Sequence, residues 1–369
     1  MPLNDTLAQE NWNRYQYCRD NGHESFLAKA IKCDDFFVGN QWPESDLALL
    51  SLQKRPAITI NKILSTVGNI LGEQIQNRTE VLFRPKNGSP EQTADALTKM
   101  WMHVSQENQL PWTRSDVFCD GLIRSRGFFD MRLKFTDSMM GELEITKLNS
   151  KNVVIDPHAD DYDPDKWNEV FVTKWLSTQE IATLHSEDDA ELLKNRARGD
   201  YKYGIDSIER DRDTFAGKII VPVGYGNIHD KAGVERTIRT IDRQYRKLDK
   251  QLHFVDVETG DMRPVPVSWD RNKIADVLSK TGGRVSTMKK LVRRIRWLVT
   301  ADNVVLHDAW SPYKHFTVVP YFPHFRYGKT MGVVENLLGP QEILNKVSSQ
   351  ELHIVNTTAN SGWGVEQNS

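Results

Sequence analysis

The stretch from Tyr327 to Asn356 reads YGKTMGVVENLLGPQEILNKVSSQELHIVN and predicts one long amphipathic helix. Its apolar residues fall near one stripe at helical spacing: Val333, Leu337, Leu344, Val347 and Val355. A second stripe carries short uncharged hydrogen-bonding side chains where a solvated face would carry lysine and glutamate: Gln341, Asn345, Ser348 and Ser349. Because such side chains allow helices to pack without burying charge, we expect this helix to contact copies of itself.

Length and charge limit the class of protein. The chain has 369 residues, more than one compact core usually holds, so we expect two or three domains. Charged residues make up 27% and hydrophobic residues 39%, which is ordinary for a folded protein. The formal net charge of -2 argues against tight gripping of nucleic acid through its phosphates. It does not argue against a protein past which nucleic acid slides.

The cysteines and the N-terminus carry no targeting or metal signal. Cys18, Cys33 and Cys119 form neither a CxxC pair nor a zinc-spaced cluster, so we expect free thiols in a reducing compartment. The sequence starts without a signal peptide and has no apolar run long enough to cross a membrane. We therefore expect synthesis inside the cell and no membrane partner.

The pattern along the chain predicts an α+β fold. The first part is helical, with a break at Asn21-Gly22, over residues 5–37, 56–77, 91–109 and 111–124. Period-two alternation then predicts a hairpin and two further strands over residues 127–135, 143–148, 153–155 and 170–175. A helix over 178–195, capped by Ser177 or Thr178, leads into an irregular polar region at 199–231.

Residues 236–320 have the pattern of a separate small module. We expect a strand pair at 237–247 and 251–257, a helix at 270–279, and a hairpin at 291–300 and 304–310. This module holds two basic clusters, which include Arg239 and Arg243 in the first and Lys289, Lys290, Arg293, Arg294 and Arg296 in the second. Such clusters usually form a solvated face, and the functional alternative is contact with phosphates or an acidic partner.

The acidic loop from Asp156 to Asp165 is the best candidate for a metal site, although a weak one. A hard cation could be held by carboxylates at Asp156, Asp160, Asp161 and Asp163. The loop lacks the turn glycine and closing glutamate of an EF-hand, so a solvated acidic loop is favoured over a metal site. A metal-dependent nucleic-acid enzyme using this loop remains the alternative function.

Sequence motifs for catalysis are absent. His158 and His185 have no partner at helix spacing, and HExxH, GxSxG and GxxxxGK[ST] do not occur. We therefore expect no catalytic residue, no cofactor and no enzymatic activity.

Four stretches, taken together and in order, resemble a known family. They are FFVGNQW at 36–42, RPAITINKI at 55–63, Asp156-Pro157 after a predicted strand, and the terminal helix with Gly332, Gln341, Asn345, Ser348 and Ser349. Together these resemble the dodecameric portal proteins of tailed bacteriophages, most closely the short-tailed, large-wing type.

The resemblance implies a ring at one capsid vertex, through which double-stranded DNA is packaged and ejected. The implied partners are the terminase large subunit, head-to-tail adaptors, and capsid and scaffolding proteins. The implied location is the virion, after assembly in the host cytoplasm. Another ring or adaptor component of a virion is a further alternative, and the length of the chain argues against it.

The resemblance also implies a division of the chain. Residues 1–177 would be wing, 178–235 a stem helix with connecting loops, 236–322 a clip-like α/β module, and 323–369 a stem helix with the start of the C-terminal wing. The polar stripe Gln341, Asn345, Ser348 and Ser349 would serve packing around the channel, and the basic residues of the module would dock partners. Because such portals usually continue further, we expect either a short variant or a chain whose remaining wing and crown are missing.

Overall fold

The computed structural model describes residues 3–85, 90–135, 139–194, 202–203, 237–266, 269–281 and 283–358. These residues fall into two compact units. Unit 1 contains the described residues of 1–12, 168–204 and 223–316, and unit 2 those of 13–167 and 317–369. Most of the region predicted to be irregular, 199–231, lies outside the described residues, as do residues 359–369. Helices and antiparallel sheets are both present, so the α+β prediction is confirmed.

The first helical segment has the break that the sequence predicts. Helix α1 (Leu3–Cys18) and helix α2 (Glu24–Val38) are joined by a π-helical turn, η1 (Arg19–His23). Gly22 adopts φ 152° there, a backbone conformation that favours glycine. Helix α2 ends at Gly39 with φ 109°, a left-handed C-cap.

The next helix begins later than predicted. Residues 55–61 are extended, and helix α4 (Lys62–Gln76) starts only after Asn61, whose side chain accepts the N–H of Leu64. The prediction of a helix from Pro56 is therefore wrong. A helix that the sequence reading missed, α3 (Glu44–Leu52), precedes this extended segment.

Unit 2 is completed by two helices, a small sheet and a hairpin. Its further elements are α5 (Glu91–Glu107), α6 (Leu110–Arg124), β1 (Gly127–Lys134), β2 (Glu142–Leu148), β3 (Val153–Ile155), β9 (Val318–Tyr321), β10 (His324–Arg326) and β11 (Lys329–Met331). The three-stranded sheet has the order β2-β1-β9. Gly127 is required where β1 meets α6, because a Cβ there would lie 2.4 Å from the carbonyl oxygen of Val117.

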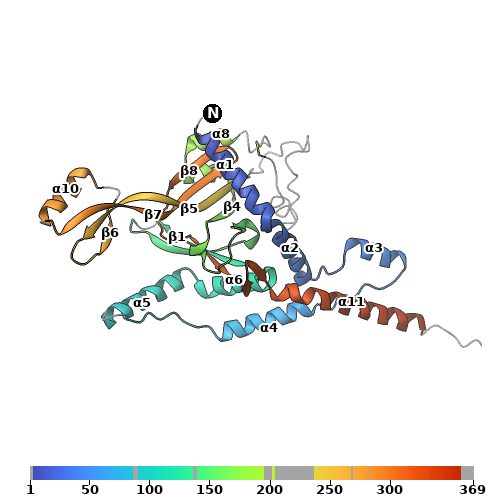
Figure 1. The fold of residues 1–369 in the computed structure, drawn as a ribbon. Coiled ribbons are helices and arrows are strands. Elements are labelled where there is room, and N and C mark those ends of the chain that lie inside the picture. The colour runs from blue at the N-terminus through green and yellow to red at the C-terminus, as the bar shows by residue number, and fades with distance from the viewer. Residues whose placement is uncertain are drawn as a thin grey trace, which may run out of the picture. The chain divides into compact units, whose positions relative to one another are not determined.

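The terminal helix is present, with a later start than predicted. Helix α11 spans Val333–Thr358, and it lies beside α2 and α4 in Figure 1. The predicted helical residues from Tyr327 onward instead turn tightly, with φ 49° at Tyr327 and 72° at Gly328, between β10 and β11. One apolar core joins α2, α4, α6 and α11 through Cys33, Phe36, Ile63, Val67, Leu122, Ile123 and Val334.

Unit 1 is built on long antiparallel strands. Its elements are β4 (Glu169–Ser177), α7 (Thr178–Leu184), α8 (Glu187–Lys194), β5 (Thr237–Asp256), β6 (Met262–Pro264), α10 (Arg271–Lys280), β7 (Val285–Ala301) and β8 (Val304–Trp310). Strands pair in the order β4-β5-β7-β8, and β6 pairs with β5. Ser177 and Glu180 form a capping box at α7, so Ser177 is the cap of the two that the sequence offers.

Two predictions in unit 1 are corrected. Residues 237–257 do not form a strand pair, because β5 runs unbroken and its partner is β7. The helix predicted over 178–195 is two short helices, separated at His185.

Strands β5 and β7 extend beyond their neighbours. Strand β4 pairs with β5 only as far as Tyr245, and β8 pairs with β7 only as far as Arg296. Beyond that point, residues 248–256 of β5 pair with residues 285–293 of β7, and residues 253–255 of β5 also pair with β6. We name residues 248–293 the arm, and Figure 1 shows α10 and β6 at its far end. The predicted helix and hairpin of the small module are thus confirmed, and the strands β5 and β7 are longer than expected.

Candidate functional site

The polar stripe of α11 is buried against an extended segment of the same chain. Gln341 Oε1 accepts the N–H of Lys62 at 3.1 Å, Asn345 Oδ1 that of Ile60 at 3.0 Å, and Ser349 Oγ that of Ile58 at 2.9 Å. The donors are alternate residues, the period with which one edge of an extended strand presents its N–H groups. Three side chains of a helix therefore accept the N–H groups that a neighbouring strand would otherwise bind.

Further hydrogen bonds connect this row to the turn at 36–42. Gln341 Nε2 donates to the Ile60 carbonyl at 2.7 Å and to Asn345 Oδ1 at 3.0 Å. Asn345 Nδ2 donates to Gln41 Oε1 at 2.6 Å, and Gln41 Nε2 donates to the Phe36 carbonyl at 2.9 Å. Three of the stretches singled out in the sequence, at 36–42, 55–63 and 332–349, thus meet in one hydrogen-bonded cluster. We name Gln41, Gln341, Asn345 and Ser349, with the backbone of residues 58–62, the polar ladder.

The orientation of α11 differs from the one expected. The stripe that was expected to face another copy is occupied by its own chain, and Ser348 is only half-buried beside it. The exposed side of α11 instead carries large apolar side chains beside exposed Lys346, Gln350 and Glu351: Ile343, Val347, Ile354 and Val355 are between 49% and 64% exposed.

Two of the predicted docking residues lie inside unit 1. Arg239 and Arg243 are buried in β5. Arg243 forms an ion pair with buried Glu169 of β4 at 2.7 Å, and the Arg239 guanidinium lies 4.9 Å from the ring centre of Trp12. Because buried charges need such partners, these arginines hold the sheet together and present little surface to a partner.

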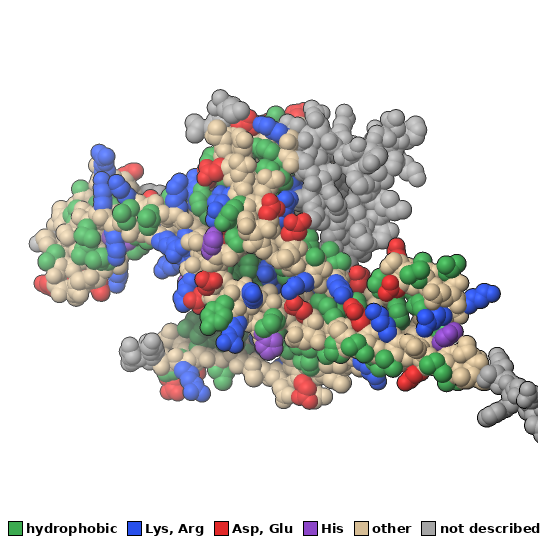
Figure 2. Space-filling view, turned by 45° about the vertical axis from the view of Figure 1, so that its right-hand side comes forward, with side chains coloured by type: hydrophobic (Ala, Val, Ile, Leu, Met, Phe, Trp, Pro, Cys, Tyr) green, Lys and Arg blue, Asp and Glu red, His purple; other side chains and the backbone are tan. Residues whose placement is uncertain are grey.

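The basic residues of β7 divide into paired and exposed members. Arg294 pairs with Asp249 at 2.8 Å and Arg296 with Asp308 at 2.7 Å, a hydrogen-bonded pairing that raises the pKa of Arg296. Arg293 donates to Asn168 at 2.9 Å. Lys289 and Lys290 are exposed on the arm. Figure 2 shows both basic and acidic side chains on the visible face.

Three carboxylates of the acidic loop bind groups within the loop or next to it. Buried Asp156 accepts the N–H of His158 at 3.0 Å, Asp161 pairs with Lys166, and Asp163 accepts the N–H of Asp165 at 3.0 Å. Asp160 is exposed. Among the described residues, no group of three or more histidine, cysteine or acidic side chains is placed to hold a metal ion.

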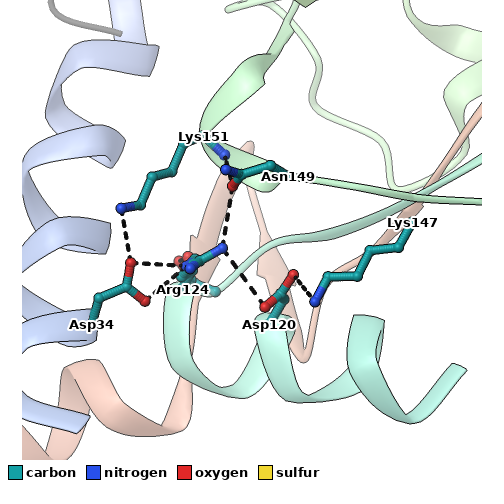
Figure 3. Close-up of polar contacts among 7 residues, drawn as sticks. Asp34, Asp120, Arg124, Lys147, Asn149 and Lys151 are labelled. Atoms are coloured by element: carbon teal, nitrogen blue, oxygen red, sulfur yellow. Dashed lines mark hydrogen bonds and ion pairs between the residues drawn. The ribbon is translucent and has the colours of Figure 1, made fainter. Parts of the chain in front are cut away.

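A cluster of charged side chains joins α2, α6, β2 and the segment that follows β2 in unit 2 (Figure 3). Arg124 Nε of α6 donates to both oxygens of Asp34 of α2, at 2.8 and 3.0 Å, and its Nη1 donates to Asn149 at 3.2 Å. Lys151, which is buried, pairs with Asp34 at 2.9 Å.

The same cluster continues along α6 to β2. Arg124 lies 3.7 Å from Asp120, and Asp120 pairs with Lys147 at 2.8 Å. The sequence reading missed this cluster because Asp34 and Arg124 are 90 positions apart and follow no local spacing. Its role is to fix α2, α6 and β2 relative to one another within unit 2.

Within the part of the chain that the structure describes, no helix is both long and apolar enough to cross a membrane. The sequence matches no curated protein. A family model described as Phage P22-like portal protein matches residues 12–369, nearly the whole chain. The match includes every segment of the polar ladder. The chain belongs to the family of Phage P22-like portal proteins.

Proposed function

We propose that twelve copies of this portal protein form the ring through which double-stranded DNA enters the capsid and later leaves it. Family membership carries this proposal: the chain is a phage portal protein, a structural component of the virion with a role in DNA packaging, and portal proteins act as oligomeric rings. The count of twelve, assembly in the host cytoplasm and the particular partners are part of the proposal.

The exposed apolar side chains of α11 support a contact between copies. A closed ring uses a heterologous contact, in which one surface of a subunit meets a different surface of the next. Exposed apolar patches on soluble proteins usually mark such contacts. Ile343, Val347, Ile354 and Val355 form one such surface, and Leu47, Leu49 and Leu52 of α3 offer another. Helix α3 has no fully buried residue within the described chain.

The arm is the surface on which we propose that the terminase large subunit and then head-to-tail adaptors dock. It projects from the sheet of unit 1 on two strands and carries exposed Lys289 and Lys290 near its outer half. Because Arg239 and Arg243 are buried, we leave them out of the proposed docking residues and keep the basic residues with exposed side chains.

We propose no catalytic role. Asp156, Asp161 and Asp163 of the loop at 156–165 form local hydrogen bonds and an ion pair, and no specific observation favours the nuclease alternative. The absence of a catalytic role is tested by incubating the purified protein with double-stranded DNA in the presence of magnesium or manganese. Cleavage by the wild type that is lost in the double variant Asp160→Ala with Asp161→Ala would contradict the proposal.

Ring formation is tested by changing the exposed face of α11. Electron microscopy and sedimentation of the purified protein should show a ring with a central hole. The double variant Ile343→Ser with Val347→Ser should remain folded and sediment as a smaller species, because it loses apolar contact area at the surface. Lys346→Ser, on the same exposed helix, is the matched control and should still form rings. A wild-type protein that stays monomeric over a wide concentration range would refute the proposal.

A further inference from the structure

Unit 2 contains a pocket of about 300 Å³ that none of the predicted sites includes. Its apolar floor consists of Val117 and Phe118 of α6, Phe129 of β1 and Tyr321 of β9. Two arginines lie at its border: Arg78, just after α4, and Arg114 of α6. The volume is at the lower end of the range for ligand pockets and suits one side chain or a small molecule.

The floor of the pocket is fixed by packing. The rings of Phe118 and Tyr321 are 5.5 Å apart between centres. Gly121 allows Tyr321 to lie directly on α6, because a Cβ at that position would be 2.5 Å from the tyrosine ring. Burial raises the pKa of Tyr321, so its hydroxyl stays protonated and adds no negative charge. A rigid aromatic floor of this kind binds a flat or bulky apolar group at low entropic cost.

The two arginines keep most of their donors available. Arg78 Nη2 donates to Ser115 Oγ at 3.2 Å, and its guanidinium lies 5.6 Å from the ring centre of Trp112. Arg114 Nη1 donates to the Thr79 carbonyl at 3.0 Å. Among the described residues neither guanidinium has a carboxylate partner, unlike Arg243 or Arg294. A guanidinium has five donors and matches a carboxylate in bidentate geometry.

The lining favours a single carboxylate over a polyanion. The charged side chains among the lining residues are the two guanidiniums of Arg78 and Arg114. Two guanidiniums can hold one carboxylate in bidentate geometry, whereas a nucleic acid presents a row of phosphates that would need more cations. The neutral amides of Gln74 and Asn77 complete the lining and can bind peptide groups.

We propose that this pocket binds an acidic segment of a partner protein, with a large aromatic side chain on the floor and an adjacent carboxylate held by Arg78 and Arg114. The proposal does not depend on the ring: it concerns a contact of unit 2 with another protein.

Binding of short peptides by calorimetry tests the proposal. The probe is N-acetyl-Phe-Asp-amide, which combines both groups. N-acetyl-Phe-Asn-amide, which lacks the charge, and N-acetyl-Ala-Asp-amide, which lacks the ring, should each bind about tenfold more weakly, equivalent to about 1.4 kcal/mol. Phenyl phosphate reports on phosphate as the alternative anion.

The variants Arg78→Gln and Arg114→Gln should each weaken binding of the acidic peptide about tenfold and leave binding of the neutral peptide almost unchanged. Arg78 is exposed, so its variant should fold even if Arg114→Gln, which loses the bond to Thr79, does not. Arg326→Gln is the matched control, because Arg326 is exposed in the same unit and does not line the pocket.

Three results would overturn the proposal. The first is equal binding of the charged and neutral peptides. The second is tighter binding of phenyl phosphate than of the acidic peptide. The third is probe binding to the single subunit that disappears in the assembled ring, which would make the pocket a contact between copies.

Discussion

At the scale of single residues, Asn345 is the centre of the polar ladder. Its side chain accepts from Ile60 and Gln341 and donates to Gln41. Asn345→Ala would leave the part-buried Ile60 N–H and the buried Gln41 amide oxygen without these partners. Since an unsatisfied buried group costs about 1–3 kcal/mol, we expect a loss of about 2 kcal/mol or more in the free energy of unfolding. Urea denaturation measures it.

Ser348→Ala is the control for that change. Ser348 is half-buried on the same helix, and no side-chain hydrogen bond of Ser348 is found within the described chain. We expect an effect within about 0.5 kcal/mol. Equal losses for the two variants would show that the ladder contributes nothing specific.

A second residue-scale prediction concerns Cys33. Burial, helped by the negative charges of Glu335 and Asp34, raises the pKa of its thiol from 9.0 to about 12. The folded state therefore holds the proton above pH 9, where the unfolded state releases it. Stability from this group is fully present below pH 9 and is lost as the pH rises toward 12. Urea midpoints at pH 8 and pH 10 should differ more for the wild type than for Cys33→Ala, and an identical pH dependence would contradict the assignment.

At the scale of elements, the arm makes the sharpest prediction. Lys289→Glu with Lys290→Glu reverses two exposed charges on β7 without touching the paired Arg294 and Arg296. We expect weaker binding of the terminase large subunit or of an adaptor, with a reduced salt dependence, and intact rings. Pull-down and surface plasmon resonance with the purified partners provide the measurement.

The control reverses two exposed lysines elsewhere, Lys99→Glu with Lys329→Glu. This variant has the same net charge as the arm variant and should bind the partner normally. Loss of the ring in the arm variant would place these lysines in a subunit contact instead.

The sequence predicted elements better than their partners. Periodicity found α11 and its two stripes, but a helical period shows which residues share a face and not what the face contacts. The strand pair predicted at 237–247 and 251–257 requires a turn between them, whereas β5 runs through that point because β7 pairs with it continuously. Pro56 suggested a helix start, but the extended segment before Lys62 is held by side chains about 280 positions away. Such long-range contacts leave no local spacing from which to predict them.

At the scale of the whole molecule, the balanced charge predicts weak contact with DNA. The formal net charge is -2, and the buried arginines of β5 are neutralised or packed inside unit 1. Non-specific DNA binders reach dissociation constants of about 10⁻⁴–10⁻⁶ M at physiological salt. We expect fluorescence anisotropy with short duplex DNA to show binding weaker than this range, since a channel must let DNA slide. Tight binding with a steep salt dependence would contradict this expectation.

The polar ladder also determines when the protein can finish folding. The backbone edge at 58–62 is made early, but its partners on α11 are synthesised about 280 residues later. At about 5–20 residues per second, the growing chain waits roughly 15–60 s with that edge unpaired. An open strand edge can pair with another nascent chain, so this interval is when misassembly on the ribosome is most dangerous. Helix α11, synthesised about 280 residues after the extended segment, therefore closes its open edge.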